Sequence, residues 1–148
     1  MRVLAAIEAA SDEDHEAIAA LLEANHLPTE GLRDSLANAL VVREGRRIVG
    51  AAALEIYASG VLLRSVVVDE RLRGTGLGRR LTQAALDRAR DLRAPSAYLL
   101  TTTAGEFFPR FGFAAIGRDE VPEDVRQSVE FTSACPASAL VMRANLLP

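Results

Sequence analysis

The chain has 148 residues, 49% of them apolar, and its 20 acidic and 17 basic side chains give a formal net charge of −3. This length and composition predict one compact soluble domain over residues 1–148, and the charge argues against a nucleic-acid partner. A single cysteine excludes an internal disulfide framework and no apolar run approaches the roughly 20 residues of a membrane span, so we expect a cytoplasmic protein with no membrane partner.

The first part of the chain predicts a strand followed by two helices. Residues 2–7 form a short apolar run that is typical of a strand. Ser11, with Asp14 three positions later, indicates a helix start. We expect this helix to end near Asn25, because Pro28 follows. A short second helix is expected around residues 30–37.

Three apolar runs come next, rich in Val, Ile and Leu and separated by turns that contain Gly45 and Gly60. They predict three consecutive antiparallel strands. The third run ends in the segment SVVVDE, residues 65–70, whose uninterrupted apolar character predicts burial on both faces. From Gly76 to about Leu92, apolar residues recur at helical spacing, which predicts an amphipathic helix.

The remaining elements alternate between strands and short helices. Residues 97–103 predict a strand, and a short helix is expected through Phe107 and Phe108. Pro122 marks another helix start. Residues 139–146 predict the last strand.

The turn between the third apolar run and the amphipathic helix is rich in glycine. Backbone N–H groups converge at such a turn and the helix dipole favours an anion there. A Walker A loop is excluded because residues 79 and 80 are both arginine, where Lys and then Ser or Thr are required. The dinucleotide fingerprint needs glycine at its first, third and sixth positions, whereas Gly74, Gly76 and Gly78 stand first, third and fifth.

The pattern Arg71-x-x-Gly74-x-Gly76, preceded by VVVD and followed by a helix, resembles the acyl-CoA pyrophosphate loop of the GNAT superfamily of N-acetyltransferases. The resemblance extends over most of the chain, to the segment FFPRFGF at residues 107–113. It implies an α/β (α+β) fold with a mixed, mostly antiparallel central sheet flanked by helices. It also implies acetyl-CoA as the acetyl donor and a small-molecule amine as the acceptor. A homodimer is a candidate state, because superfamily members often pair through their final strands. The residues that would hold the donor are Val66, Val67, Val68, Arg71, Arg73, Gly74, Thr75, Gly76, Leu77, Gly78, Arg79 and Phe108.

The resemblance also assigns chemical roles. A backbone N–H around Val67 would polarise the thioester carbonyl. The tyrosine that commonly protonates the departing thiolate in this family is replaced here by Phe108, which cannot donate a proton. Tyr57, Tyr98 or water could serve instead. The thiol of CoA is also acidic enough for its thiolate to leave without a general acid.

Two carboxylates are candidates for the general base, Glu55 in the second apolar run and Glu130 in the C-terminal part. A general base must lie within reach of the acceptor amine and titrate near the working pH. For Glu55 the alternative is an exposed position on one face of a strand.

Residues 128–142, SVEFTSACPASALVM, resemble a branch of the superfamily that is associated with arsenic-resistance operons. Its relatives acetylate the amino group of amino-acid analogues with an anionic head. Arg64 and Arg110 could then pair with carboxylate or arsonate-like oxygens. No metal or arsenic site is expected at Cys135, because a soft metalloid needs more than one thiolate. Two alternatives remain open: an acetyltransferase for ordinary amino acids, polyamines or protein N-termini, and a binding module that senses acyl-CoA without turnover.

Overall fold

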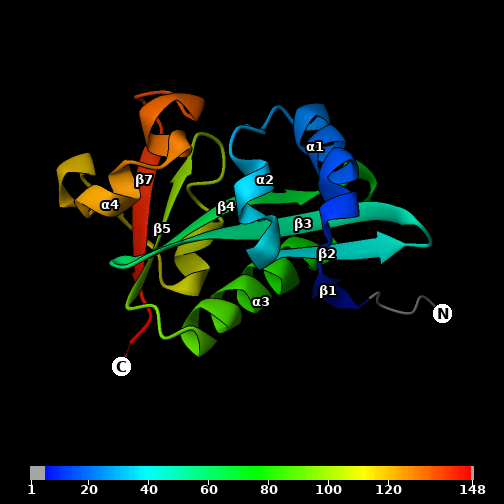
Figure 1. Cartoon of the computed structure of the whole chain (residues 1–148), viewed down its shortest axis with the longest axis horizontal. Helices are drawn as coiled ribbons and strands as arrows, with labels where there is room; N and C mark the ends of the chain where they lie inside the picture. Colours follow the sequence, from blue (N-terminus) through cyan, green and yellow to red (C-terminus); the bar gives the residue numbers. More distant parts are fainter. Residues whose placement is uncertain (1–5, 148) are drawn as a thin grey trace.

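A computed structural model describes residues 6–147, which form a seven-stranded sheet flanked by helices (Figure 1). The strand order is β1-β2-β3-β4-β5-β7-β6, and every neighbouring pair is antiparallel except β4 and β5, which are parallel. This mixed, mostly antiparallel sheet confirms the predicted fold class. The strands are β1 (Ile7–Ala9), β2 (Ala39–Glu44), β3 (Arg47–Tyr57), β4 (Gly60–Val68), β5 (Ser96–Thr101), β6 (Ala114–Ile116) and β7 (Leu140–Asn145).

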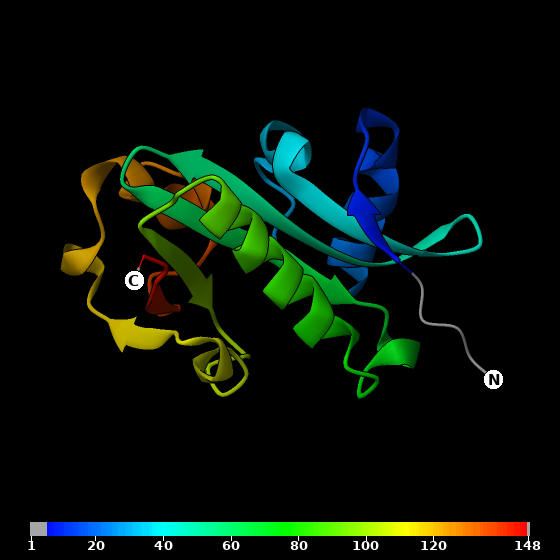
Figure 2. The same cartoon turned by 90° about the horizontal axis from the view of Figure 1, so that it is seen from below.

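Helix α3 covers one face of the sheet, and α1 and α2 cover the other (Figure 2). Leu81 and Leu86 lie on the apolar side of α3 and are buried against β2, β3 and β4. On the opposite face, Ile18 and Leu22 of α1 are buried in a second core cluster. The helices are α1 (His15–Ala24), α2 (Leu32–Ser35), α3 (Leu77–Asp91) and α4 (Glu123–Arg126), with 3-10 turns at Asp12–Asp14, Leu36–Asn38, Glu70–Leu72, Phe108–Phe111 and Arg118–Glu120 and a π-helical turn at Glu130–Ala134.

The three predicted antiparallel strands are confirmed as β2, β3 and β4. The third of them contains a β-bulge. Ala51 of β3 pairs with Val67 of β4, and Ala53 pairs with Arg64, so β4 has one residue more than β3 between these two pairs. Ser65 lies within the bulge and has a left-handed φ of 58°. Such an insertion bends the strand that carries it.

The bulge changes which residues of β4 face α3. Val61 and Leu63 pack in the core on the α3 side before the bulge, and Val66 and Val68 pack on that side after it. Val67 belongs to the core on the α1 side. The predicted burial on both faces is wrong for Val66 and Val68, which are only half-buried because they border a cavity.

That cavity exists because β4 and β5 separate. Val61 pairs with Ala97 and Leu62 with Tyr98, and within the described residues these are the only pairs between the two strands. Beyond them β4 continues to Val68 without a partner on its β5 side. The sheet is therefore open at its centre.

The ends of the chain differ in detail from the sequence-based expectations. Residues 2–5 of the expected first strand lie outside the described residues, and the observed strand β1 is fixed by the pairing of Ile7 with Val42 on β2. The strand expected over residues 97–103 ends at Thr101, where its pairing with β7 ends. Strand β6 was not predicted, because two of its three residues are exposed and give no apolar pattern.

Candidate active site

A cavity of about 790 Å3, called here the first cavity, opens where β4 and β5 separate. Residues 63–68 of β4 form one wall, and residues 99–104 of β5 and the turn after it form another. Residues 25–28, which follow α1, and the segment around Glu130 close further sides. The cavity therefore has strand backbone on two sides and both polar and apolar side chains on the others.

The ladder between β3 and β4 shows which backbone groups face this cavity. The N–H of Asp69 donates to the carbonyl of Val49 at 2.8 Å. Because the hydrogen-bonding direction alternates along a strand, Val67 also turns its N–H and C=O toward β3. The groups of Val66 and Val68 then point to the open side. The N–H expected around Val67 is therefore offered most directly by its neighbour Val66.

The glycine-rich turn lies at the end of the first cavity. Gly74 and Gly76 have φ values of 82° and 86°, a left-handed conformation that glycine adopts without strain. A Cβ on either residue would meet no atom within 4 Å, so the turn is open on its outer side. Gly76 is the N-cap of α3, and no side chain caps the helix. The N–H groups of its first turn are thus available to an anion.

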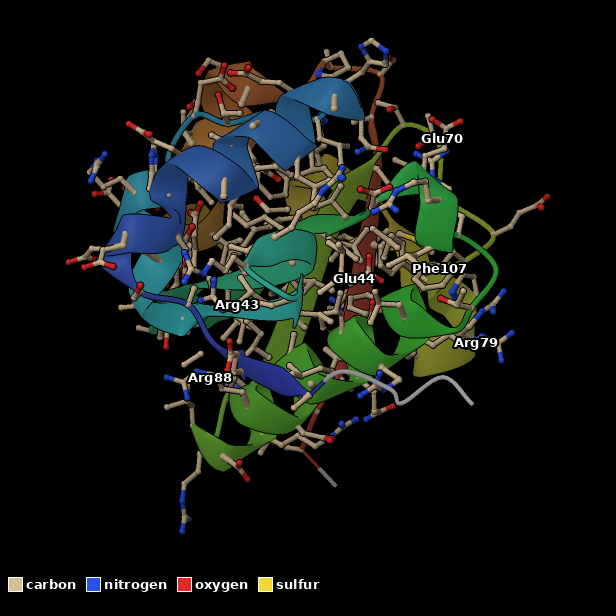
Figure 3. All side chains as sticks on the ribbon, turned by 90° about the vertical axis from the view of Figure 1, so that its right-hand side faces the viewer. Arg43, Glu44, Glu70, Arg79, Arg88 and Phe107 are labelled. Carbon is tan, nitrogen blue, oxygen red and sulfur yellow. The ribbon has the colours of Figure 1, made fainter. Side chains whose placement is uncertain are left out.

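A second cavity of about 600 Å3 lies over this turn. Residues 72–79 line it together with Phe107 and Arg110. Figure 3 shows Phe107 beside the first turn of α3 and Arg79 extending away from it. The guanidinium of Arg110 lies 4.9 Å from the centre of the Phe107 ring. The walls therefore combine backbone N–H groups with three arginine side chains, Arg73, Arg79 and Arg110.

The other arginines of the turn point in different directions. Arg73 lines both cavities. Arg71 lies 3.6 Å from Glu44 and 3.4 Å from Asp69, and it lines neither cavity. Arg110 borders the second cavity only, so the structure does not bring it together with Arg64.

Phe108 stands at the position where the resemblance leads one to expect a tyrosine, and the structure places it in the core with one side on the first cavity. It is 7% exposed and packs against Phe107 and Phe113, with ring centres 5.1 and 5.9 Å away. Neither Tyr57 nor Tyr98 is among the described residues that line this cavity. No tyrosine hydroxyl therefore reaches it within the described part of the chain.

A buried ion cluster borders the first cavity. The side chain of Arg64 is fully buried, with Nη1 2.7 Å from Oε2 of Glu55 and Nε 3.6 Å from Oε2 of Glu130. The hydroxyl of Tyr57 donates to the second oxygen of Glu55. Among the described residues, Nη2 of Arg64 is buried without a hydrogen-bond partner. Glu55 is thus held by two donors, and it is not among the described residues that line the cavity.

Glu130 lines the first cavity and is 4% exposed. Burial raises its pKa from 4.5 to about 7, Arg64 opposes this rise and Glu55 adds to it. Burial and the neighbouring Glu130 also raise the pKa of the Cys135 thiol to about 12, so this thiol stays protonated at neutral pH. Of the two candidate bases, Glu130 is the one that lines the first cavity, and its pKa is raised to near neutral pH, where a general base works.

The sequence did not indicate residues 25–28 or Cys135 as parts of the site. His26 has a left-handed φ of 58° and lines the first cavity beside Asn25. Cys135 comes close to Glu130 because its N–H donates to the Glu130 carbonyl at 3.1 Å in the π-helical turn. Neither feature has a local signal in the sequence, since both depend on how distant segments fold against β4.

Two further properties concern residues 6–147 as a whole. In this part of the chain no helix combines the length and the apolar character needed to cross a membrane. It also contains no group of three or more His, Cys, Asp or Glu side chains placed to hold a metal ion.

Comparison with known proteins gives curated relatives of the same kind. The chain is 27% identical over 104 residues to an amino-acid acetyltransferase of Neisseria meningitidis, a match that covers 69% of this chain and 24% of the relative. It is 35% identical over 80 residues to an amino-acid acetyltransferase of Mycobacterium tuberculosis, covering 53% of this chain and 45% of the relative. The chain therefore spans less than half the length of these relatives.

A solved structure shares the fold. The crystal structure of N-acetylglutamate synthase from Neisseria gonorrhoeae, complexed with coenzyme A and N-acetyl-glutamate, superposes with a TM-score of 0.83 at 24% identity, over 100% of this chain and 36% of that one. The family model for the acetyltransferase (GNAT) domain matches residues 35–115. This match spans more than half of the chain and includes the strands and the glycine-rich turn that build both cavities. The chain therefore belongs to the GNAT acetyltransferase family.

Proposed function

We propose that this protein transfers the acetyl group of acetyl-CoA to the primary amine of a small acceptor that resembles an amino acid. The observation that carries the proposal is the continuity of the site: Val68 and Arg73 line both cavities, so an anion site and an open strand edge form one path. A thioester donor with a pyrophosphate at one end needs an anion site for that pyrophosphate. The amide-containing arm that leads from it to the thioester needs an adjoining strand edge with free backbone groups.

The donor would lie along this path. Its pyrophosphate fits the N–H groups between Arg73 and Arg79, where the glycines leave the backbone open. Its amide-containing arm would pair with the free groups of Val66 and Val68. The N–H of Val66 would then polarise the thioester carbonyl. Phe108 would pack against the arm.

Glu130 would act as the general base. An acceptor amine is protonated at neutral pH, and its nitrogen attacks only after it loses a proton. The carboxylate of Glu130 would take that proton, the nitrogen would bond to the carbonyl carbon, and the C–S bond would break. The nitrogen would then release its second proton to water, which leaves the neutral amide. The electrons of the C–S bond leave with the sulfur, which needs no general acid because a CoA thiolate is a good leaving group. This step is compatible with Phe108 in place of tyrosine.

Arg64 supports an acceptor with an anionic head. It lines the first cavity, and its Nη2 has a free donor within the described part of the chain. A carboxylate or an arsonate-like group matches a guanidinium fork. The names of the relatives, amino-acid acetyltransferases and N-acetylglutamate synthase, agree with this class. Within it, the resemblance of residues 128–142 to the arsenic-associated branch favours an arsenic-bearing or phosphinic amino-acid analogue.

A sensor of acyl-CoA is the second candidate. Phe108 favours it, because the site lacks the usual proton donor. Such a protein would bind acetyl-CoA but would not release a thiol with any acceptor.

Thiol release from acetyl-CoA, followed with a disulfide reagent, separates these functions. The panel contains ordinary amino acids including glutamate, arsenic-bearing and phosphinic analogues, and polyamines. We expect turnover with an anionic amino-acid acceptor. Turnover with polyamines alone would contradict the role of Arg64, and CoA binding without any turnover would favour the sensor.

A further inference from the structure

Arg73 has a position that the donor site alone does not explain. Its side chain is exposed on the glycine-rich turn and borders both cavities. Its Nη2 donates a hydrogen bond to the side-chain oxygen of Asn25. Asn25 belongs to a different part of the chain and lines the first cavity only. The contact therefore joins the anion site to the wall of the neighbouring cavity.

Asn25 begins the segment of residues 25–28, called here the strap. Its side-chain amide donates to the carbonyl of Leu21 at 2.8 Å, which ties the strap to the last turn of α1. The N–H groups of Asn25, His26 and Leu27 each donate back to that turn, at 3.0 to 3.1 Å. The strap has no partner strand among the described residues, and these three bonds can open locally.

Arg73 can hold the strap and an anion at the same time. A guanidinium has five N–H donors, and among the described residues only the one to Asn25 has a hydrogen-bond partner. A pyrophosphate at the glycine-rich turn would take other donors of the same group, and charged acceptors make the stronger bonds. An anion that fixes the guanidinium of Arg73 also restricts the movement of Asn25, its hydrogen-bond partner, and thereby of the strap.

We propose that Arg73 and Asn25 act together as positioning residues that transmit occupation of the pyrophosphate site to the strap, so that the donor stabilises the wall of the acceptor cavity before the acceptor arrives. This inference rests on the proposed function, because it takes the pyrophosphate of CoA as the anion. The coupling is reciprocal, so an acceptor bound against the strap also strengthens donor binding.

Amide hydrogen exchange with CoA as the probe tests the coupling without a known acceptor. We expect saturating CoA to slow exchange at Asn25, His26 and Leu27 by about 5-fold or more, the lower end of a typical coupling. The turn at Gly45 and Arg46, which lines neither cavity, serves as the internal reference and keeps its exchange rate. Calorimetry in parallel reports CoA binding itself.

Two variants remove the contact from opposite sides. Asn25→Ala removes the acceptor, and Arg73→Met removes the donors while keeping an unbranched side chain at an exposed position. In both, saturating CoA is expected to leave exchange in the strap unchanged. Glu23→Ala is the matched control, because Glu23 is an exposed residue in the last turn of α1 and its variant is expected to keep the slowing.

The outcomes are distinct. Slowing in the unaltered protein and in Glu23→Ala, but in neither contact variant, supports the coupling. If CoA binds to the unaltered protein without slowing exchange in the strap, the coupling is overturned. Slowing that persists in Arg73→Met overturns it too, and either result leaves the proposed function intact. If calorimetry detects no CoA binding, the proposed function fails together with this inference.

Discussion

Oε2 of Glu55 lies 2.7 Å from Nη1 of Arg64, and this pair joins β3 to β4 directly beside the first cavity. Arg64 is fully buried and also lies 3.6 Å from Glu130, so one cation serves two carboxylates. The charge balance of the site consequently depends on whether Glu130 holds a proton. Each group in this cluster can therefore be tested through its effect on the others.

Arg64→Leu is expected to lower the free energy of unfolding at pH 7 by about 3–5 kcal/mol, because it leaves the buried Glu130 and the half-buried Glu55 without their counter-charge. Urea denaturation measures this loss. Arg126→Leu is the control, since Arg126 is exposed on α4. Equal losses in the two variants would contradict the importance of the buried cluster.

Glu130→Gln is expected to lower kcat by about 10²–10⁴-fold, the usual contribution of a positioned general base. In the unaltered enzyme, kcat/KM should fall on the acid side with an apparent pKa near 7, the pKa of Glu130. Steady-state rates from pH 5.5 to 9 measure both effects. Glu123→Gln, at an exposed position in α4, controls for loss of a carboxylate. An unchanged rate and acid limb in Glu130→Gln would assign the base to another group.

Glu55→Gln separates the two candidate bases. It removes a like charge near Glu130 and leaves Arg64 freer to pair with that carboxylate, so the pKa of Glu130 should fall. The acid limb of kcat/KM is then expected to move to lower pH while the rate above pH 8 stays similar. Loss of activity at every pH would identify Glu55 as the base instead.

The stability of the protein should also report the state of Glu130. Its pKa in the folded state, about 7, lies above the value of 4.5 for an unperturbed glutamate. The folded state therefore binds the proton more tightly, and this contribution is complete below pH 4.5 and is lost as the pH rises through 7. Relative to Glu130→Gln, the unaltered protein is expected to lose up to about 3 kcal/mol between these values. Parallel pH profiles of the two unfolding free energies would contradict the raised pKa.

Gly74→Glu is expected to abolish CoA binding, because a carboxylate would meet the pyrophosphate at close range. The φ of 82° at Gly74 adds backbone strain that any side chain would cause. Gly45→Glu is the matched control, with a φ of 64° and nothing within 4 Å of its Cβ position. Calorimetry should show CoA binding in the control alone. Similar affinities in both variants would remove the turn from the donor site.

Local patterns predicted much of the fold. The meander of β2, β3 and β4 and the amphipathic helix α3 have strong periodicity, and the structure confirms them nearly to the residue. The short strand β6 and the π-helical turn at Glu130 have no such periodicity. Strand β6 forms because β7 supplies its hydrogen-bond partners, which a local pattern does not contain. The π-helical turn instead closes its own hydrogen bond, from the Cys135 N–H to the Glu130 carbonyl.

The site was predictable where it is made of consecutive residues, as in the glycine-rich turn. It was less so where it depends on distant segments. Glu55 and Glu130 looked equivalent in the sequence, but the fold ties Glu55 to Arg64 and Tyr57 and leaves Glu130 on the cavity. Arg110 was expected beside Arg64, yet it stacks on Phe107 over the second cavity.

The extra residue bends β4 but does not decide which residues of that strand pack in the core. Ala52 lies between the pairs that flank the bulge, so a chain without Ser65 could set Val66 opposite Ala52 in a regular ladder. Without the insertion, regular alternation from Leu63 would still place Arg64 on the α1 side of the sheet and Val66 on the α3 side. Both residues would therefore keep their present faces. The core would be preserved while the bend disappeared and β4 could continue beside β5. One inserted residue thus makes the difference between a closed scaffold and a sheet with an entrance.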